Sequence, residues 1–223
     1  MKVVVFDLGG TLMQYIGMPY SWVDFYYQGF QAINVKYQCN VSEDVIAKSQ
    51  EILREFNPRV NYREEEYSPE HIFSKALKDW KLNVPVQSCV DTFWEGLHLK
   101  AEIYSDTISV LKCLKEKGYK IATLTDLPSA MPDELFKKDI HSLLEYFDYY
   151  VSSGSCGYRK PNCNGLRFIA NQFEVEMSEI CFVGDEEKDR MTADNAGCKF
   201  VQIKRGRTEE GCISNLYQLL EVL

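Results

Sequence analysis

The 223-residue chain is poor in histidine, in clustered basic charge and in long apolar runs. It has three histidines, and none of its eight cysteines forms a C-x-x-C pair, the close ligand spacing that is typical of zinc sites. Disulfide scaffolds usually occur in much shorter secreted chains, so scattered cysteines at this length indicate free, mostly buried thiols. A reducing cytoplasm is therefore the expected compartment.

Positive charge is equally scarce, because the formal net charge is −8. The one basic cluster, formed by Lys204, Arg205 and Arg207, is too small to attract the phosphate backbone of a nucleic acid. No segment approaches the roughly 20 consecutive apolar residues that a membrane helix needs. Asp7 interrupts the first apolar run too early for a signal peptide. We therefore expect neither a nucleic acid nor a membrane as a partner.

The composition that remains is that of a globular protein, with 45% apolar and 26% charged residues. On folding, a chain of this length buries roughly 70% of the surface that its unfolded form exposes. A substantial core can therefore form without metal or disulfide links. The length allows one domain with a large insertion, or two modest domains.

Short apolar runs that end in polar or small residues recur along the chain. They span residues 3–6, 119–124, 149–151, 180–183 and 200–203. Runs this short and continuous suit strands that are covered on both faces, as in parallel sheets. Helical patterns lie between them, at residues 107–117, 133–146, 165–173, 187–196 and 214–222. The alternation predicts an α/β fold with a doubly wound parallel sheet, in which ligands bind beyond the carboxyl ends of the strands.

Residues 14–100 interrupt this alternation and have mainly helical patterns, including a helix over 43–56 and another over 90–99. Ser68 followed by Pro69 predicts a helix start, with serine as the N-cap and proline in the first turn. The segment is rich in aromatic residues. We expect most of them to form the core of a helical subdomain and some to line a pocket that faces the strand ends.

Asp7 and Thr125 directly follow two of the predicted strands. Residues 9–11, Gly-Gly-Thr, form a flexible turn after Asp7, and the backbone amides of such a turn can bind an oxyanion. Thr125 offers one hydroxyl donor. Because the carboxyl ends of parallel strands meet at one edge of a sheet, these groups are candidates for one site.

Asp185 lies at the end of the fourth predicted strand, and Asp189 comes four residues later, so both share a face if a helix begins there. Lys160 lies in a loop ahead of a predicted helix. Carboxylates that converge with a lysine indicate a hard cation such as Mg²⁺, bound together with a phosphate. The order of these residues along the chain, together with the predicted sheet, is a much more specific indication of a functional site than any one of them.

Together these segments resemble the four motifs of the haloacid dehalogenase-like (HAD) hydrolase superfamily. Residues 6–12 (FDLGGTL) resemble motif one and residues 122–126 (ATLTD) motif two. Residues 159–161 (RKP) resemble motif three, and residues 182–189 (FVGDEEKD) resemble motif four. The resemblance implies a Rossmann-like HAD core over residues 1–13 and 101–223. It implies that the insert at 14–100 is a helical C1-type cap.

The resemblance also implies a mechanism. Asp7 would be the nucleophile that attacks a phosphoryl group, giving an aspartyl-phosphate that water hydrolyses. The cofactor would be Mg²⁺, held by Asp7, the backbone carbonyl of Gly9 and Asp185, with Asp189 in support. Thr125 and Lys160 would act in catalysis by binding the phosphoryl oxygens. Gly10, Thr11 and Asp126 would complete the phosphate site, and the substrate would be a small phosphorylated metabolite.

Gly9 departs from the family pattern. Phosphatases of the family carry a second aspartate at this position, which acts as the general acid for the leaving group. Glycine cannot carry a proton, and general acid catalysis typically contributes ~10²–10⁴-fold to the rate. An alkoxide leaving group needs that help more than an acyl, aryl or anhydride leaving group. Gly9 therefore favours substrates with good leaving groups.

Two other readings stay open. Gly9, and Asp126 where the family commonly has asparagine, are compatible with a non-catalytic protein that binds a ligand or partner. An extra negative charge at Asp126 would weaken anion binding unless it is paired. The phosphonatase branch uses a cap lysine, for which Lys48 is a candidate. The dehalogenase branch uses a cap arginine, for which the candidates are Arg54, Arg59 and Arg63. The identity of the substrate and the oligomeric state stay open.

Overall fold

A parallel five-stranded sheet is the centre of the fold in the computed structural model, which describes residues 1–18 and 22–223. Its strand order is β4-β1-β5-β6-β7. The strands are β1 (Val3–Phe6), β4 (Lys120–Thr123), β5 (Ile180–Gly184), β6 (Lys199–Ile203) and β7 (Cys212–Ile213). All four residues of β1 and all five of β5 are buried, as expected for central strands covered on both faces. The predicted parallel α/β sheet is confirmed.

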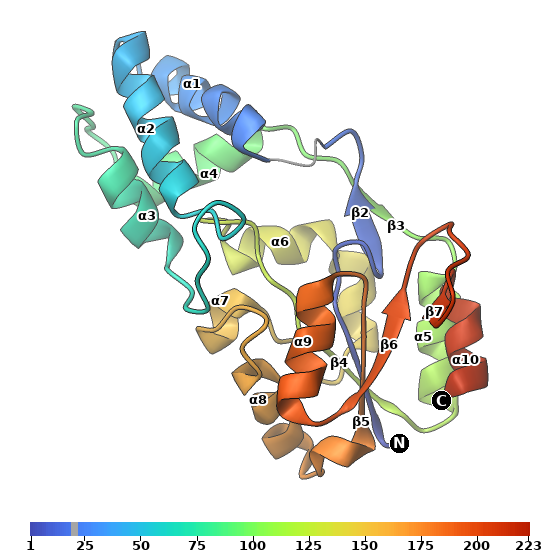
Figure 1. The fold of residues 1–223 in the computed structure, drawn as a ribbon. Helices are drawn as coiled ribbons and strands as arrows, with labels where there is room; N and C mark the ends of the chain where they lie inside the picture. Colours follow the sequence, from blue (N-terminus) through green and yellow to red (C-terminus); the bar gives the residue numbers. More distant parts are fainter. Residues whose placement is uncertain (19–21) are drawn as a thin grey trace.

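Helices cover both faces of this sheet (Figure 1). One face packs against α5 (Thr107–Glu116), the 3₁₀ turns η2 (His141–Tyr146) and η4 (Leu216–Gln218), and α10 (Leu219–Val222). The other face packs against α8 (Asn164–Phe173) and α9 (Glu187–Ala196). Alternate residues of β1 enter the two cores, Val4 and Phe6 the first and Val3 and Val5 the second.

Several segments differ from the predicted elements. Residues 149–151 form no strand: isolated bridges join Tyr149 to Ala122 and Ser152 to Thr125, because side chains take the place of part of the backbone ladder. The Thr123 hydroxyl accepts a hydrogen bond from the backbone amide of Val151. The Asp148 carboxylate accepts one from the backbone amide of Ile121. The helix predicted over 133–146 is divided: its first part is α6 (Asp133–Asp139), and its second part is the 3₁₀ turn η2. The helix predicted over 214–222 is divided between η4 and α10, and strand β7 was not predicted.

The remaining short elements lie between these. They are the 3₁₀ turn η1 (Trp22–Phe25), strands β2 (Met13–Tyr15) and β3 (Ala101–Ile103), helix α7 (Ser153–Cys156) and the 3₁₀ turn η3 (Met177–Glu179). Strands β2 and β3, which were not predicted, pair antiparallel where the chain leaves and re-enters the sheet region. This pair brings the two ends of the long insertion side by side.

Four helices make up most of the insert and form a separate layer at the upper left of Figure 1. They are α1 (Tyr26–Lys36), α2 (Glu43–Glu55), α3 (Pro69–Ala76) and α4 (Val86–Gly96). The Ser68 hydroxyl accepts the amide of His71, so the predicted N-cap is present. Phe30, Phe73 and Phe93 pack edge to face or tilted in the centre of this layer.

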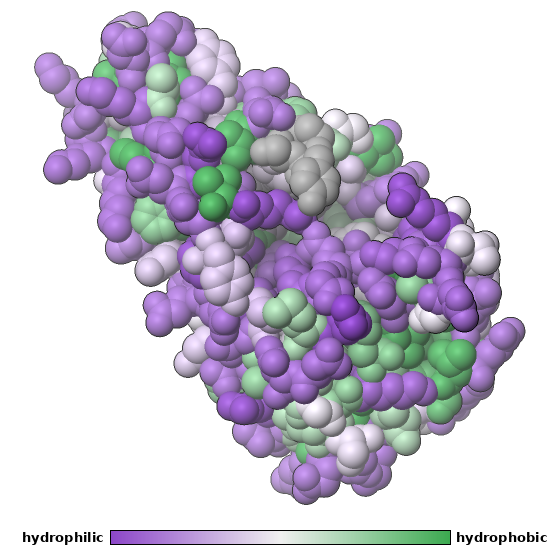
Figure 2. All heavy atoms as spheres, viewed as in Figure 1, coloured by the Kyte–Doolittle hydropathy of each residue, from purple (hydrophilic) through white to green (hydrophobic). Residues whose placement is uncertain are grey.

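The surface is mostly hydrophilic on the face drawn in Figure 2, and it is indented between the insert and the sheet region. Among the described residues, no helix combines the length and the apolar character needed to cross a membrane.

Candidate active site

A cavity of about 310 Å³ lies between the insert and the carboxyl ends of the parallel strands. Asp7, Thr125 and Asp185 reach it from the ends of β1, β4 and β5. The sheet side of the cavity also contributes Gly9, Gly10, Asp126, Arg159, Lys160, Glu186 and Lys188. The insert side contributes Trp22, Tyr26, Asn57, Pro58, Arg59 and Trp94. The aromatic residues of the insert thus divide as expected, between the helical core and the cavity wall.

Lys160 joins two of the predicted carboxylates. Its ammonium donates to Asp7 Oδ1 at 2.7 Å and to Asp189 Oδ1 at 2.5 Å, and the residue is 5% exposed. Burial alone would lower the pKa of Lys160, but the charges of Asp189, Asp7 and Asp126 outweigh it and raise the pKa well above its ordinary value. The contacts with Asp7 and Asp189 therefore stabilise the charged form of Lys160.

Asp7, Asp185 and Asp189 form a compact carboxylate cluster, with one oxygen of each within 4.8 Å of the others. Burial raises the pKa of Asp7 to about 8, and the charges of Asp189 and Asp185 add to the effect against the opposing charge of Lys160. Burial and the charge of Asp189 likewise raise the pKa of Asp185 to about 6. Oδ1 of Asp185 is buried and accepts no hydrogen bond from any described residue. Excess negative charge and an orphaned hard oxygen donor fit a divalent cation.

The two glycines of the Asp7 turn differ in their surroundings. Gly10 has φ +77°, and a Cβ at this position would lie 2.3 Å from Oδ2 of Asp185. Only glycine therefore allows the turn to approach Asp185 this closely. A Cβ at Gly9 would meet nothing within 4 Å, and Gly9 is not in the left-handed region. Space for a Cβ thus exists at the position where this sequence lacks one.

Asp126 is a paired carboxylate. Its Oδ1 accepts the backbone amide of Lys160 at 3.0 Å, and its Oδ2 lies 3.1 Å from the ammonium of Lys188. Burial would raise the pKa of Asp126, but Lys188, Arg159 and Lys160 overcome burial and lower it to about 2. The extra negative charge is therefore matched locally, and Asp126 fixes the backbone of Lys160.

The two predicted threonines occupy different surroundings. Thr125 is buried and lines the cavity. Thr11 is fully buried, and it is not among the residues that line the cavity. Its hydroxyl has no hydrogen-bond partner among the described residues, and its carbonyl accepts from Arg205 Nε at 3.1 Å. One guanidinium nitrogen of Arg205, Nη1, also donates to both carboxylate oxygens of Asp106, at 2.7 and 2.8 Å.

Sequence reasoning missed a chain of charges along the cavity wall. The ammonium of Lys188 lies 2.7 Å from Glu186, and Glu186 pairs in turn with Arg59 of the insert. Despite burial, the charges of Lys188 and Arg59 lower the pKa of Glu186 to about 2. The position of Lys188 directly before Asp189, in the first turn of α9, was a signal for its place near the site.

The alternative cap residues lie in different places. Lys48 is exposed on α2 and does not line the cavity. Arg54 is also exposed and lies 3.3 Å from Glu51 on its own helix. Arg63 pairs with Glu66 at 3.0 Å. Of these four residues, only Arg59 lines the cavity.

Comparison with known proteins identifies a matching family and several related phosphatases. A model of the haloacid dehalogenase-like hydrolase family matches residues 1–197. A phosphoglycolate phosphatase of Vibrio vulnificus strain YJ016 is 26% identical over 153 residues, which cover 64% of this chain and 66% of that protein. One from Vibrio cholerae is 23% identical over 204 residues, which cover 88% of this chain and 81% of that protein. The match spans 66% of the length of the phosphoglycolate phosphatase from strain YJ016. It spans 51% of the one from Vibrio vulnificus strain CMCP6 and 61% of the one from Vibrio parahaemolyticus.

Solved structures share the fold along the whole chain. A HAD phosphatase from Thermococcus onnurineus superposes with a TM-score of 0.64 at 22% identity, covering 100% of this chain and 97% of that chain. A 2-haloacid dehalogenase from Pseudomonas syringae superposes with a TM-score of 0.68 at 19% identity and the same coverage. The family match, over most of the length, agrees with the parallel sheet and the carboxylate cluster at its edge. This chain belongs to the haloacid dehalogenase-like hydrolase family.

Proposed function

We propose that this protein is a Mg²⁺-dependent phosphatase that acts on a small phosphorylated metabolite through Asp7. The observation that carries the proposal is the contact of one buried ammonium, that of Lys160, with both Asp7 and Asp189 beside the orphaned oxygen of Asp185. A nucleophilic carboxylate, a cation for the phosphoryl oxygens and a set of metal-binding oxygens then share one cavity.

In the proposed reaction, an oxygen of Asp7 attacks phosphorus while the bond from phosphorus to the leaving group breaks. A water molecule then attacks the aspartyl-phosphate, which releases inorganic phosphate and regenerates Asp7. Lys160 and Thr125 bind the phosphoryl oxygens, and the ammonium of Lys160 reduces repulsion between the anion and Asp7. Asp7, the Gly9 carbonyl and Asp185, with Asp189 in support, would hold Mg²⁺, which would supply neutralisation of the phosphoryl charge.

Gly9 sets the preferred leaving group. Without a proton donor at this position, an alkoxide leaves poorly, and an acyl or aryl phosphate is the better substrate. The names of the bacterial relatives favour a different choice, because phosphoglycolate is an alkyl phosphate. We propose the preference that follows from Gly9 and use phosphoglycolate as the discriminating substrate.

We further propose that residues 14–100 act as a cap on a core formed by residues 1–13 and 101–223. The insert contributes Trp22, Tyr26 and Trp94 to the cavity wall, so it contacts the part of the substrate that leaves. A wall of aromatic rings also excludes water from the phosphoryl group.

A panel of three substrates tests the proposal: acetyl phosphate, para-nitrophenyl phosphate and 2-phosphoglycolate, each with and without Mg²⁺. The first two should turn over, the third should be slower, and Asp7→Asn should abolish all turnover. Equal turnover of phosphoglycolate would contradict the argument from Gly9. If no phosphate turns over and beryllofluoride with Mg²⁺ does not bind at Asp7, the protein is instead a non-catalytic member of the family.

A further inference from the structure

The insert forms a backbone contact with the loop that carries Lys160. Residues 64–66 run antiparallel to residues 157–159, with a bridge between Glu65 and Tyr158. The Glu66 amide donates to the Gly157 carbonyl at 3.0 Å, and the Arg159 amide donates to the Glu64 carbonyl at 2.8 Å. We call residues 64–66 the strap. It holds the loop at the residue directly before Lys160.

The side chain of Glu66 adds further contacts to this backbone pairing. It forms an ion pair with Arg159 and accepts the hydroxyl of Ser153 at 2.6 Å. Arg63, also in the insert, lies 3.0 Å from the same carboxylate. The side chains of Glu66 and Arg159 are 8% and 5% exposed, so water screens their attraction little. Glu66 is therefore the ionic link between the insert and the Lys160 loop.

Arg159 passes this restraint on to the site. Its guanidinium also donates to the Leu127 carbonyl at 2.8 Å, and the residue lines the cavity. The next residue, Lys160, is fixed through its amide by Asp126 and through its ammonium by Asp7. Between the strap on one side and Asp126 on the other, the loop has little freedom to move the ammonium away from Asp7.

We propose that Glu66 is a positioning residue that sets the place of the Lys160 ammonium through Arg159, so that docking of the insert and assembly of the phosphoryl site occur together. The inference rests on the proposed role of Lys160. Glu66 does not line the cavity, so it acts without touching the substrate. The strap makes the catalytic lysine sensitive to the position of a segment almost 100 residues earlier in the chain.

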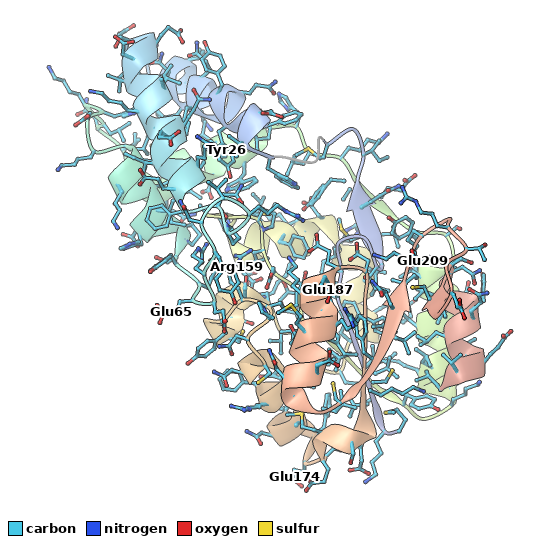
Figure 3. All side chains as sticks on the ribbon, in the orientation of Figure 1. Tyr26, Glu65, Arg159, Glu174, Glu187 and Glu209 are labelled. Carbon is cyan, nitrogen blue, oxygen red and sulfur yellow. The ribbon has the colours of Figure 1, made fainter. Side chains whose placement is uncertain are left out.

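The neighbouring glutamate offers a matched control. Glu65 is exposed, and Figure 3 shows it at the outer edge of the molecule, with Arg159 further inside. Glu66→Gln and Glu65→Gln therefore make the same change of charge at adjacent positions. With acetyl phosphate and saturating Mg²⁺, Glu66→Gln should lower kcat about 10- to 100-fold, because a small displacement of a catalytic group costs that much. Glu65→Gln should stay within about twofold of the wild type, as expected for a surface charge.

Stability is measured on the same variants, because removing one partner of a buried pair also destabilises the fold. Rates are compared at a temperature where thermal unfolding shows every variant to be folded. Arg159→Lys keeps the positive charge but cannot contact both Glu66 and the Leu127 carbonyl. It should therefore lower kcat, as Glu66→Gln does. When Glu66→Gln and Arg159→Lys are combined in one protein, their effects on kcat should not add, since both residues act through one contact. A Glu66→Gln variant that is folded and keeps the wild-type kcat overturns the proposal.

Inorganic phosphate separates this inference from the proposed function. In the presence of Mg²⁺, phosphate should stabilise the wild type and Glu65→Gln against heat, and it should stabilise Glu66→Gln and Lys160→Ala less. If wild type binds phosphate but turns over no substrate, the proposed function fails and the binding comparison still tests Glu66. If substrates turn over and Glu66→Gln matches Glu65→Gln in rate and binding, the positioning role fails alone. A wild type that neither binds phosphate nor turns over a substrate overturns both.

Discussion

Gly10 lies so close to Asp185 that a single added carbon would collide with the carboxylate, at 2.3 Å from Oδ2. The turn that follows Asp7 is therefore shaped by the residue that follows β5, and the two strand ends form one unit. Gly9, one position earlier, has free space around it. This contrast between adjacent glycines gives two of the predictions below.

Gly10→Ala should abolish the carboxylate site, and Gly9→Ala should be tolerated. Alanine at residue 10 must adopt a φ that is costly for a side chain and must displace Asp185. We expect a loss of about 100-fold or more in activity for Gly10→Ala, because the carboxylates lose their alignment. Activity and Mg²⁺ affinity of the two variants are measured together. Equal effects of the two substitutions would contradict the close approach of Gly10 to Asp185.

Gly9→Asp should create activity toward alkyl phosphates. A Cβ at Gly9 meets no neighbour within 4 Å, and Gly9 lines the cavity. A general acid at this position should raise kcat/KM for 2-phosphoglycolate by about 10²-fold or more. Gly9→Asn is the control, because asparagine has nearly the same size and carries no acidic proton. An equal gain with asparagine would show that the effect comes from shape, and no gain with either would reject the general-acid argument.

Lys188→Ala should weaken substrate binding more than it slows chemistry. The substitution leaves Asp126 and Glu186 at the cavity wall without the cation that they share. An anionic substrate then meets extra negative charge, and KM should rise about tenfold with a smaller change in kcat. Arg190→Ala is the matched control, since Arg190 lies on the same helix, is exposed and pairs with Glu187. A similar rise of KM in both variants would mean that only net charge matters.

Affinity for Mg²⁺ should fall as the pH is lowered from about 8 to about 6. In the absence of a cation, burial raises the pKa of Asp7 to about 8 and that of Asp185 to about 6, so cation binding must displace protons. The affinity should change by up to about tenfold per pH unit for each proton displaced. Titration with Mg²⁺ at pH 6, 7 and 8 measures this, and an affinity independent of pH would contradict the raised pKa values.

The same groups predict how the stability of the metal-free protein depends on pH. A carboxyl group whose pKa is raised on folding contributes stability below its unfolded pKa, and this contribution is lost as the pH rises through the folded pKa. The Tm without Mg²⁺ should therefore decline between pH 5 and about 8. Added Mg²⁺ should reduce or reverse the decline, and Asp7→Asn should remove the part nearest pH 8.

The sequence was most informative where chemistry follows directly from topology. The buried run at Val3–Phe6 forms a strand with the predicted bounds, and Asp7 therefore stands at its carboxyl end. Asp185 and Asp189 come together because a strand is followed by the first turn of a helix. Parallel strands end at one edge, so the meeting of these residues could be expected without any knowledge of the packing.

Contacts between distant segments were out of reach. Nothing in the local pattern around Glu66 indicates its ion pair with Arg159, 93 residues later. The pairing of Asp126 with Lys188 depends on how two strand ends are spaced, which periodicity does not reveal. The segment at 149–151 is apolar like a strand, but the hydroxyl of Thr123 takes part of its backbone bonding. Side-chain partners of this kind override propensity.

Arg205, in the last part of the chain, contacts two segments of the core that are distant in sequence. Its guanidinium joins the Thr11 carbonyl, in the turn after Asp7, to the carboxylate of Asp106 at the start of α5. Arg205 lies beyond residue 197, where the match to the family ends. Arg205 thus ties the turn that follows Asp7 to the start of α5 from outside the family match. We expect a substitution at Arg205 to disturb the turn that follows Asp7 without removing a group from the cavity, which Arg205 does not line.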